Sequence, residues 1–291
     1  MCFSVKTNVK AYFNFKLDGR IYILLAKIHL MLKKLSTPKF VIVCFIALLI
    51  TSCSSDNDSD VVEGGSNSTA ENKQALGESA HDFLSADDFT SLQLEIGYVE
   101  GFRPTQTTIN NLVQFFEDRI HKPDGISIKE TVVPATTQGT LSTDEVVTIE
   151  NDNRTEYNAG DELAVWVFFA DNNSEKDEGN SVVLGTAYRN TSCVIFEKTI
   201  RDYSSSVNGS NQSLIESATI MHEFGHLFGL VNVGSEMQQD HEDNENNSHC
   251  TNDNCLMYYQ TVNDVFSMTG LSSLPQFDEF CLADLRANGG K

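Results

Sequence analysis

The segment from Asn211 to Leu230 contains the pattern that most constrains this chain. Its residues His222 and His226 lie four apart, and residues at that spacing share one face of a helix, so both imidazoles can bind one metal ion. Glu223 directly follows the first histidine and is placed to accept a proton from a water molecule at that metal. The pattern H-E-x-x-H therefore predicts a catalytic zinc site on a helix.

The rest of the segment supports a helix that packs on a core. Apolar or small residues recur at spacings of three and four, as in an amphipathic helix: Leu214, Ala218, Met221, Gly225 and Phe228. Gly229 follows, and glycine readily adopts the left-handed conformation that ends a helix. We expect the chain to turn there, so that a residue further along can return to the metal.

A second motif lies downstream, where His249 to Met257 reads H-C-x4-C-x-M. Together, the two motifs resemble the metzincin clan of zinc peptidases, and most closely its archaemetzincin branch. The resemblance rests on specific motifs over about the last 80 residues and on coarse pattern over about 130 before them. It implies that His222, His226 and His249 bind zinc and that Glu223 is the general base.

The resemblance also implies further features of the site and of the fold. Met257 would form a methionine turn beneath the metal, and Tyr259 would either stabilise an oxyanion or simply pack there. The domain would be a zincin with a twisted mixed sheet and an active-site helix. Its edge strand, at residues 181–188, would bind substrate by strand addition or be an ordinary strand of the sheet.

The chain departs from the metzincin pattern in two places. Asn232 stands where the third histidine is expected, so about 17 residues, roughly 232–248, must loop out before His249. This polar, acidic segment contains His241, the rival third ligand. The archaemetzincin pattern ends in C-x-x-C, which helps to bind a second zinc. Here Cys281 is followed by Asp284, and Cys250, Cys255 and Cys281 could still hold a metal with that aspartate.

Two other interpretations remain open. In thermolysin-like enzymes the third ligand is a glutamate, and Glu242 or Glu245 lies at a workable distance. Gly229 and the methionine motif argue against that arrangement. Alternatively, the protein is a lipoprotein binding module with a structural or vestigial zinc site, which would not need the base Glu223.

The N-terminal residues predict an exported protein. Residues 31–52 resemble a lipoprotein signal peptide, with a basic start and an apolar run of 11 residues from Phe40 to Ile50. Ile50 to Cys53 then fits a lipobox, which implies a lipid on Cys53 and an anchor in the bacterial envelope. The alternative is a plain secretory signal. We expect residues 1–30 to be an extension of the gene model upstream of a start at Met31.

The remaining sequence divides into a tether and a catalytic domain. Residues 53–80 are rich in Ser, Asn, Asp, Glu and Gly, which predicts a disordered tether, and residues 81–291 are long enough for one core. Segments of strand and helix pattern alternate along the domain, which predicts an α/β fold. Strands are expected at 89–100, 126–133, 163–170, 182–188 and 193–200, and helices at 107–120 and 278–286.

The net charge indicates which binding partners to expect, and the cysteine content indicates whether disulfides form. Residues 53–291 carry 12 basic and 40 acidic residues, a net charge of −28 that disfavours nucleic acid. We therefore expect a peptide or protein substrate. Four cysteines remain, an even number in an exported protein, so disulfides are the first expectation. A bond between Cys250 and Cys255 would close a small loop directly before Met257, although the sequence alone does not set the pairing. Metal ligation by the same thiols is the alternative.

Overall fold

The computed structural model describes residues 69–291 except 180, 207–211 and 261–272. The described residues belong to one compact unit, Glu63–Lys291. The expected signal peptide, Cys53 and the first part of the tether lie outside them. No helix in the described part of the chain is long and apolar enough to cross a membrane.

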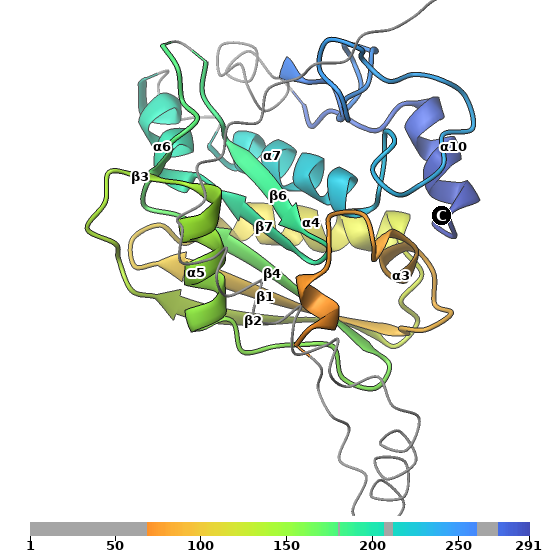
Figure 1. Cartoon of the computed structure of the whole chain (residues 1–291), viewed down its shortest axis with the longest axis horizontal. Helices are drawn as coiled ribbons and strands as arrows, with labels where there is room; N and C mark the ends of the chain where they lie inside the picture. Colours follow the sequence, from red (N-terminus) through yellow and green to blue (C-terminus); the bar gives the residue numbers. More distant parts are fainter. Residues whose placement is uncertain (1–68, 180, 207–211, 261–272) are drawn as a thin grey trace, which may run out of the picture. The chain divides into compact units, whose positions relative to one another are not determined.

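A five-stranded mixed sheet forms the centre of the unit, with strand order β2-β1-β4-β7-β6 (Figure 1). The strands are β1 (Ser91–Val99), β2 (Gly125–Val133), β4 (Glu162–Phe169), β6 (Gly185–Arg189) and β7 (Ser192–Ile195), and a separate pair is β3 (Thr140–Leu141) with β5 (Asn173–Ser174). β1 pairs in parallel with β2 and β4, and β4 with β7. β6 is antiparallel to β7 and forms one edge. The prediction of an α/β fold with a mixed sheet is confirmed.

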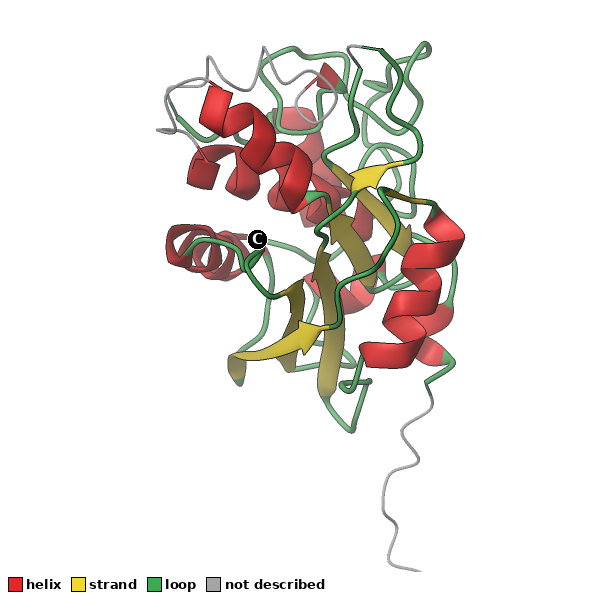
Figure 2. Ribbon diagram, turned by 90° about the vertical axis from the view of Figure 1, so that its left-hand side faces the viewer, coloured by secondary structure: helices red, strands yellow, loops and turns green. Residues whose placement is uncertain are grey.

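Helices cover both faces of this sheet (Figure 2). They are η1 (Glu71–Lys73), α3 (Ala80–Leu84), α4 (Gln106–Arg119), α5 (Thr143–Asn153), α6 (Glu197–Ser206), α7 (Gln212–Leu227) and α10 (Glu279–Ala287). α4 and α7 pack on one face and α5 on the other. The long helix α7 therefore has a rigid sheet behind it, which positions the residues it carries.

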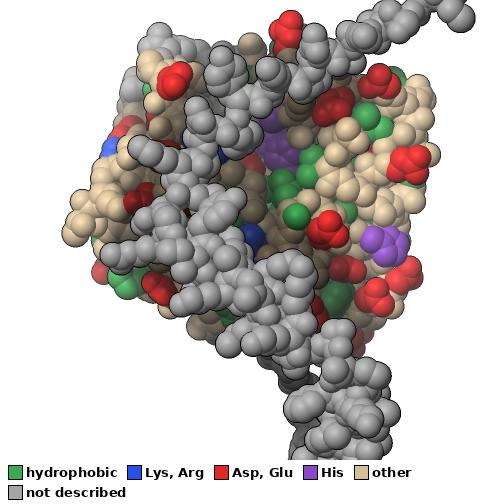
Figure 3. Space-filling model, viewed as in Figure 1, with side chains coloured by type: hydrophobic (Ala, Val, Ile, Leu, Met, Phe, Trp, Pro, Cys, Tyr) green, Lys and Arg blue, Asp and Glu red, His purple; other side chains and the backbone are tan. Residues whose placement is uncertain are grey.

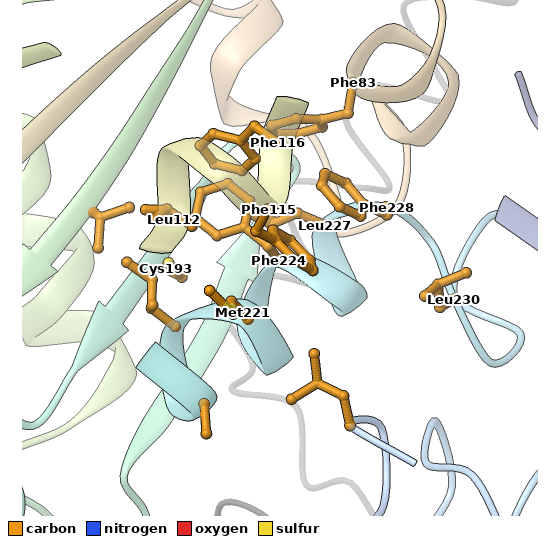
Figure 4. Close-up of a cluster of buried hydrophobic side chains, with 14 of the residues drawn as sticks. Phe83, Leu112, Phe115, Phe116, Cys193, Met221, Phe224, Leu227, Phe228 and Leu230 are labelled. Atoms are coloured by element: carbon orange, nitrogen blue, oxygen red, sulfur yellow. The ribbon is translucent and has the colours of Figure 1, made fainter. Parts of the chain in front are cut away.

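β4 is apolar after Glu162, as suits a strand with both faces covered. Alternate residues of a strand point to opposite faces, so Val165 and Val167 join the core under α4 and α7, whereas Trp166 packs on the α5 side. Phenylalanines from α3, α4 and α7 interlock in the larger core (Figure 4). The Phe116 and Phe224 rings meet edge to face with centroids 4.6 Å apart. This packing fixes α7 against α4.

Two helices differ from what the sequence pattern indicates. The strand expected at 193–200 ends at Ile195, and α6 begins at Glu197. α5 was not expected, although Ser142 and Glu145 form a capping box at its start, in which each side chain binds the other's backbone N–H. The predicted strands β1, β2 and β4 and helices α4 and α10 are confirmed within two residues at each end.

The segment just before α3 is part of the folded unit. Asn72 is fully buried, and its amide nitrogen donates to Asn158 Oδ1 at 2.7 Å and to the carbonyl oxygen of Ala164 at 3.0 Å. Asn190 reaches the same segment, donating to Ser79 Oγ at 3.0 Å. Folded structure therefore begins before residue 81, and these polar contacts explain why a polar segment packs against the domain.

Candidate metal and catalytic site

α7 ends next to Gly229, as the sequence predicts. The helix stops at Leu227, and Gly229 has the left-handed φ of +74°. The N–H of Leu230 donates to Gly225 O and that of Gly229 to His226 O, both at 3.0 Å. This is the Schellman arrangement, which satisfies carbonyls at the helix end. The chain therefore leaves the helix directly after His226, the second histidine of the motif.

The structure brings His249 beside the two histidines of α7. The ring centroids of His222 and His226 are 4.9 Å apart, and His249 lies 5.2 Å from the first and 5.1 Å from the second. One ring nitrogen from each residue lies within 4.8 Å of the other two. His241, the rival third ligand, lies elsewhere. The arrangement can hold one metal ion.

The hydrogen bonds of these rings leave nitrogen atoms turned inward. His222 donates through Nδ1 to Leu256 O at 2.7 Å, and its buried Nε2 has no partner. His226 Nδ1 is likewise buried without a partner. His249 donates through Nδ1 to Asn247 O at 2.9 Å. Buried polar atoms are nearly always satisfied, and a backbone acceptor on the other nitrogen is typical of a metal-binding histidine. The residues present therefore fit zinc.

Burial keeps the three imidazoles neutral. It lowers the pKa of His222 well below its usual value, with a smaller contribution from the neighbouring rings. It lowers the pKa of His226 to about 3, and it also lowers that of His249. A neutral imidazole has a free lone pair, so these residues can bind a cation without first losing a proton at neutral pH.

Glu223 is buried at the floor of the same site. Its side chain accepts a hydrogen bond from the Ala187 N–H of β6 at 2.7 Å, and the residue is 2% exposed. Burial raises the pKa of Glu223 to about 8, and this hydrogen bond opposes the rise. The place of the carboxylate also depends on Gly185, because a Cβ there would lie 2.7 Å from Glu223 Oε1. The edge strand thus positions this side chain.

A cleft of about 230 Å³ opens over these residues. The three histidines and Glu223 line one side of it, and the β6 segment 185–187 lines another. Histidine side chains are visible in a hollow of the molecular surface (Figure 3). A larger hollow of about 480 Å³ lies near His81 and Lys122, but no group of converging ligands occurs there among the described residues.

Met257 packs against α7 at Gly225. It is fully buried, and a Cβ built on Gly225 would lie 2.2 Å from its sulfur and 3.2 Å from Phe277 Cε1. Gly225 sits between Glu223 and His226 in the sequence, so close approach of Met257 to the helix requires a glycine there.

Replacing Gly225 by alanine should therefore lower the free energy of unfolding. Overpacking costs about 1–3 kcal/mol, and the better helix propensity of alanine offsets up to about 1 kcal/mol. We expect a net loss of about 1–2 kcal/mol in urea denaturation. Gly139→Ala is the control, since nothing lies within 4 Å of a Cβ at that position. Equal stability of the Gly225 and Gly139 variants would disprove the close contact.

The loop from Asn232 to Ser248 is not the simple surface excursion that its composition suggests. His241 within it is 3% exposed. Its Nε2 lies 2.8 Å from Asp284 Oδ2, and its ring stacks on Phe280 at 5.7 Å. Both contacts come from α10, which therefore fixes His241 within this loop.

The cysteines do not form the expected disulfide. Cys193, Cys250, Cys255 and Cys281 are all buried free thiols, so the Cys250–Cys255 bond is absent. His241 and Asp278 converge with Cys250 and Cys281, whereas Asp284 is not part of that group.

Glu242, the glutamate considered as a third metal ligand, lies outside the histidine site. Glu242 accepts from the Ser248 N–H at 2.8 Å and from Asn232 Nδ2 at 3.2 Å. It is not part of the histidine group, which disfavours the thermolysin-like arrangement.

The ring of Tyr259 lies edge-on to His249, with centroids 5.1 Å apart. Sequence reasoning missed the contact of Ala187 with Glu223, since a backbone N–H leaves no signal in the residue type.

Comparison with known proteins gives a distant likeness in structure. No protein-family model matches the sequence, and no curated protein matches it. Among solved structures, the chain is similar to archaemetzincin from Methanopyrus kandleri, with 16% sequence identity and a TM-score of 0.45. The match covers 68% of this chain and 96% of that chain.

Proposed function

We propose that this protein is a zinc-dependent endopeptidase whose metal is held by His222, His226 and His249. One observation carries the proposal. Three neutral imidazoles converge, two of which, His222 and His226, are buried and have an unpartnered nitrogen. The buried carboxylate of Glu223 lines the same cleft. Three protein ligands leave the fourth position of a tetrahedral zinc open, which is the arrangement of catalytic zinc sites.

Each residue then has a distinct role. A zinc ion in this site would polarise the scissile carbonyl and make a water molecule acidic enough to lose its proton near neutral pH. The positive charge of that zinc would lower the pKa of Glu223 from its raised value, so that the carboxylate could take the proton and later pass it to the leaving amine. The Ala187 N–H holds the carboxylate in place during both transfers. Leu256 O fixes the orientation of the His222 ring.

The position of the cleft supports a peptide substrate. β6 is an edge strand and also lines the cleft. An extended peptide can add to such an edge by backbone hydrogen bonds, which would lay its carbonyl groups across the metal site. A net charge of −28 over residues 53–291 argues against nucleic acid as the substrate.

The proposal is tested by metal analysis and peptide digestion on the same samples. We expect the wild-type protein to cleave members of a peptide library. The His222→Ala variant should contain one zinc equivalent less and should no longer cleave them. His81→Ala is the control, because it removes a histidine that lies outside the site, where it pairs with Asp87 at 3.0 Å. Full zinc content and cleavage in His222→Ala would reject the proposal.

We further propose that the enzyme is anchored to the bacterial envelope through lipid on Cys53. The support is the lipobox Ile50–Cys53 after an apolar run. In a bacterial host, Cys53→Ser should accumulate an uncleaved precursor and lose labelling by a fatty-acid probe. Cys193→Ser, which changes a buried cysteine of the domain, should still be labelled. Equal labelling of the Cys53 variant and the wild type would contradict the anchor.

A further inference from the structure

Among the described residues that line the cleft over the histidine site, Lys176 is the one that carries a positive side chain. The others are apolar, small or hydroxyl-bearing, apart from the three neutral histidines and Glu223. Lys176 is exposed, and its ammonium group forms no ion pair or hydrogen bond within the described part of the chain. This charge is therefore available to a ligand that enters the cleft.

Lys176 lies beside the start of the edge strand β6. Together with Thr186 of that strand it lines both the cleft and a smaller hollow on the α5 side of the sheet. The Lys176 N–H donates to Ser174 Oγ at 3.2 Å, and the next residue, Asp177, accepts the Val183 N–H at 2.8 Å. These bonds hold the backbone of Lys176 in place, so binding through its side chain orders little further chain.

The opposite end of the cleft is apolar. Asn190, directly after β6, donates its N–H to Gln74 O at 3.2 Å and accepts the Gln74 N–H on its side-chain oxygen at 3.0 Å. Leu76, two residues further along, lines the cleft. The cleft thus has an apolar side chain towards the end of β6 and a cationic one towards its start.

This polarity determines which part of a bound peptide meets Lys176. A peptide that adds to the outer edge of β6 in the antiparallel direction, the slightly more stable pairing, runs from the end of the strand towards its start. Ala187, in the middle of β6, holds Glu223, so the scissile bond would lie near that residue. The residues that follow the scissile bond, which form the leaving group, would then lie beside Lys176.

The acidic residues next to Lys176 do not cancel its effect inside the cleft. Glu175, Asp177 and Glu178 flank it in the sequence, but none of them lines the cleft. A ligand in the cleft can therefore contact the ammonium group directly, whereas it meets those carboxylates only across solvent, where a high dielectric constant weakens the repulsion. A carboxylate is the group that complements such a contact.

We propose that Lys176 forms a carboxylate-binding subsite on the leaving-group side of the cleft. It selects peptides that carry a carboxylate there, either as an acidic side chain or as a free C-terminus. The inference rests on the proposed peptidase function and specifies its substrates. Lys176 binds the substrate and takes no part in the proton transfers. We expect a preference of about fivefold in kcat/KM, the upper range for an exposed ion pair.

The subsite is tested with matched peptides derived from a sequence that the wild-type protein cleaves. They share every residue before the scissile bond, and after it they carry glutamate or glutamine, and a free or an amidated C-terminus. The wild type should prefer one charged form over its neutral counterpart, which identifies the source of the carboxylate. About 1 M salt should remove the preference, since it screens an exposed pair. Equal kcat/KM for all four peptides would overturn the subsite.

Substitutions then assign the preference to Lys176. Lys176→Gln should bring the charged-to-neutral ratio of kcat/KM to about one, Lys176→Arg should keep the preference, and Lys176→Glu should reverse it. Lys198→Gln is the control, because it removes an exposed lysine that pairs with Asp202 on α6, away from the cleft. A wild-type ratio in Lys176→Gln would overturn the assignment.

A binding measurement separates this inference from the proposed function. Peptide affinity for the zinc-loaded Glu223→Gln variant does not depend on cleavage. The charged peptide should bind about fivefold more tightly than its neutral counterpart, and adding Lys176→Gln should remove the difference. If the wild type cleaves no peptide but this difference is found, the peptidase function fails and the subsite stands. If cleavage is found and the two affinities are equal, the subsite alone is overturned.

Discussion

Glu223→Gln should leave the zinc content unchanged and lower peptidase turnover by about 100-fold or more. Glutamine matches glutamate in size and can still accept the Ala187 hydrogen bond through its amide oxygen, but it cannot take up a proton at neutral pH. General acid–base catalysis contributes about 10²–10⁴-fold, so the loss should appear in kcat while KM changes little.

This variant also separates an enzyme from a lipoprotein binding module with a structural zinc. Steady-state turnover and zinc content are measured on the same preparations, with Glu117→Gln on the exposed face of α4 as the control. Near wild-type turnover in the Glu223 variant would remove this residue from the mechanism. Absence of turnover in the zinc-loaded wild type would instead favour the binding module.

His249→Ala should weaken zinc binding at the histidine site by more than about 100-fold. The variant keeps only His222 and His226 as ligands, and losing a direct ligand should exceed the 10–100-fold effect of losing an outer hydrogen-bond partner. The affinity is measured by restoring the activity of metal-free protein at buffered zinc concentrations. This readout follows the histidine site and is independent of metal at the thiols.

His241→Ala is the matched comparison, since both histidines come from the segment after α7. Its half-maximal zinc concentration should stay within about tenfold of wild type, because His241 faces Asp284 and Cys250 and not the cleft. The reverse outcome, in which the His241 variant loses zinc-dependent activity and the His249 variant retains it, would place the third ligand in the inserted loop.

Much of the site follows from local sequence. The spacing of His222 and His226 places both rings on one face because any helix has 3.6 residues per turn. Gly229 ends that helix because it can take a positive φ at little cost. β4 could likewise be predicted, since a continuous apolar run between turn signals is typical of a strand covered on both faces. These features depend on neighbours within one or two turns of the chain.

Other features depend on residues far apart in the sequence. The loop between Asn232 and His249 could be long because the entropy of loop closure grows slowly with length. The length of the loop therefore could not exclude His241, although the resemblance, through the spacing of His249 to Met257, implied His249. The choice between them depends on α10, whose Asp284 binds His241 from 43 residues away and draws it to the thiols.

The position of the Glu223 side chain likewise depends on residues far away in the sequence. The carboxylate is held by the Ala187 N–H of β6, 36 residues earlier, and Gly185 leaves room for it. The sequence by itself therefore determined the residues of α7 and where that helix ends. Only the tertiary structure decided which histidine lies beside His222 and His226, which strand holds the Glu223 side chain and where the thiols meet. The physical reason is that these last contacts form between distant segments, where packing and burial, rather than local backbone preference, select the partner.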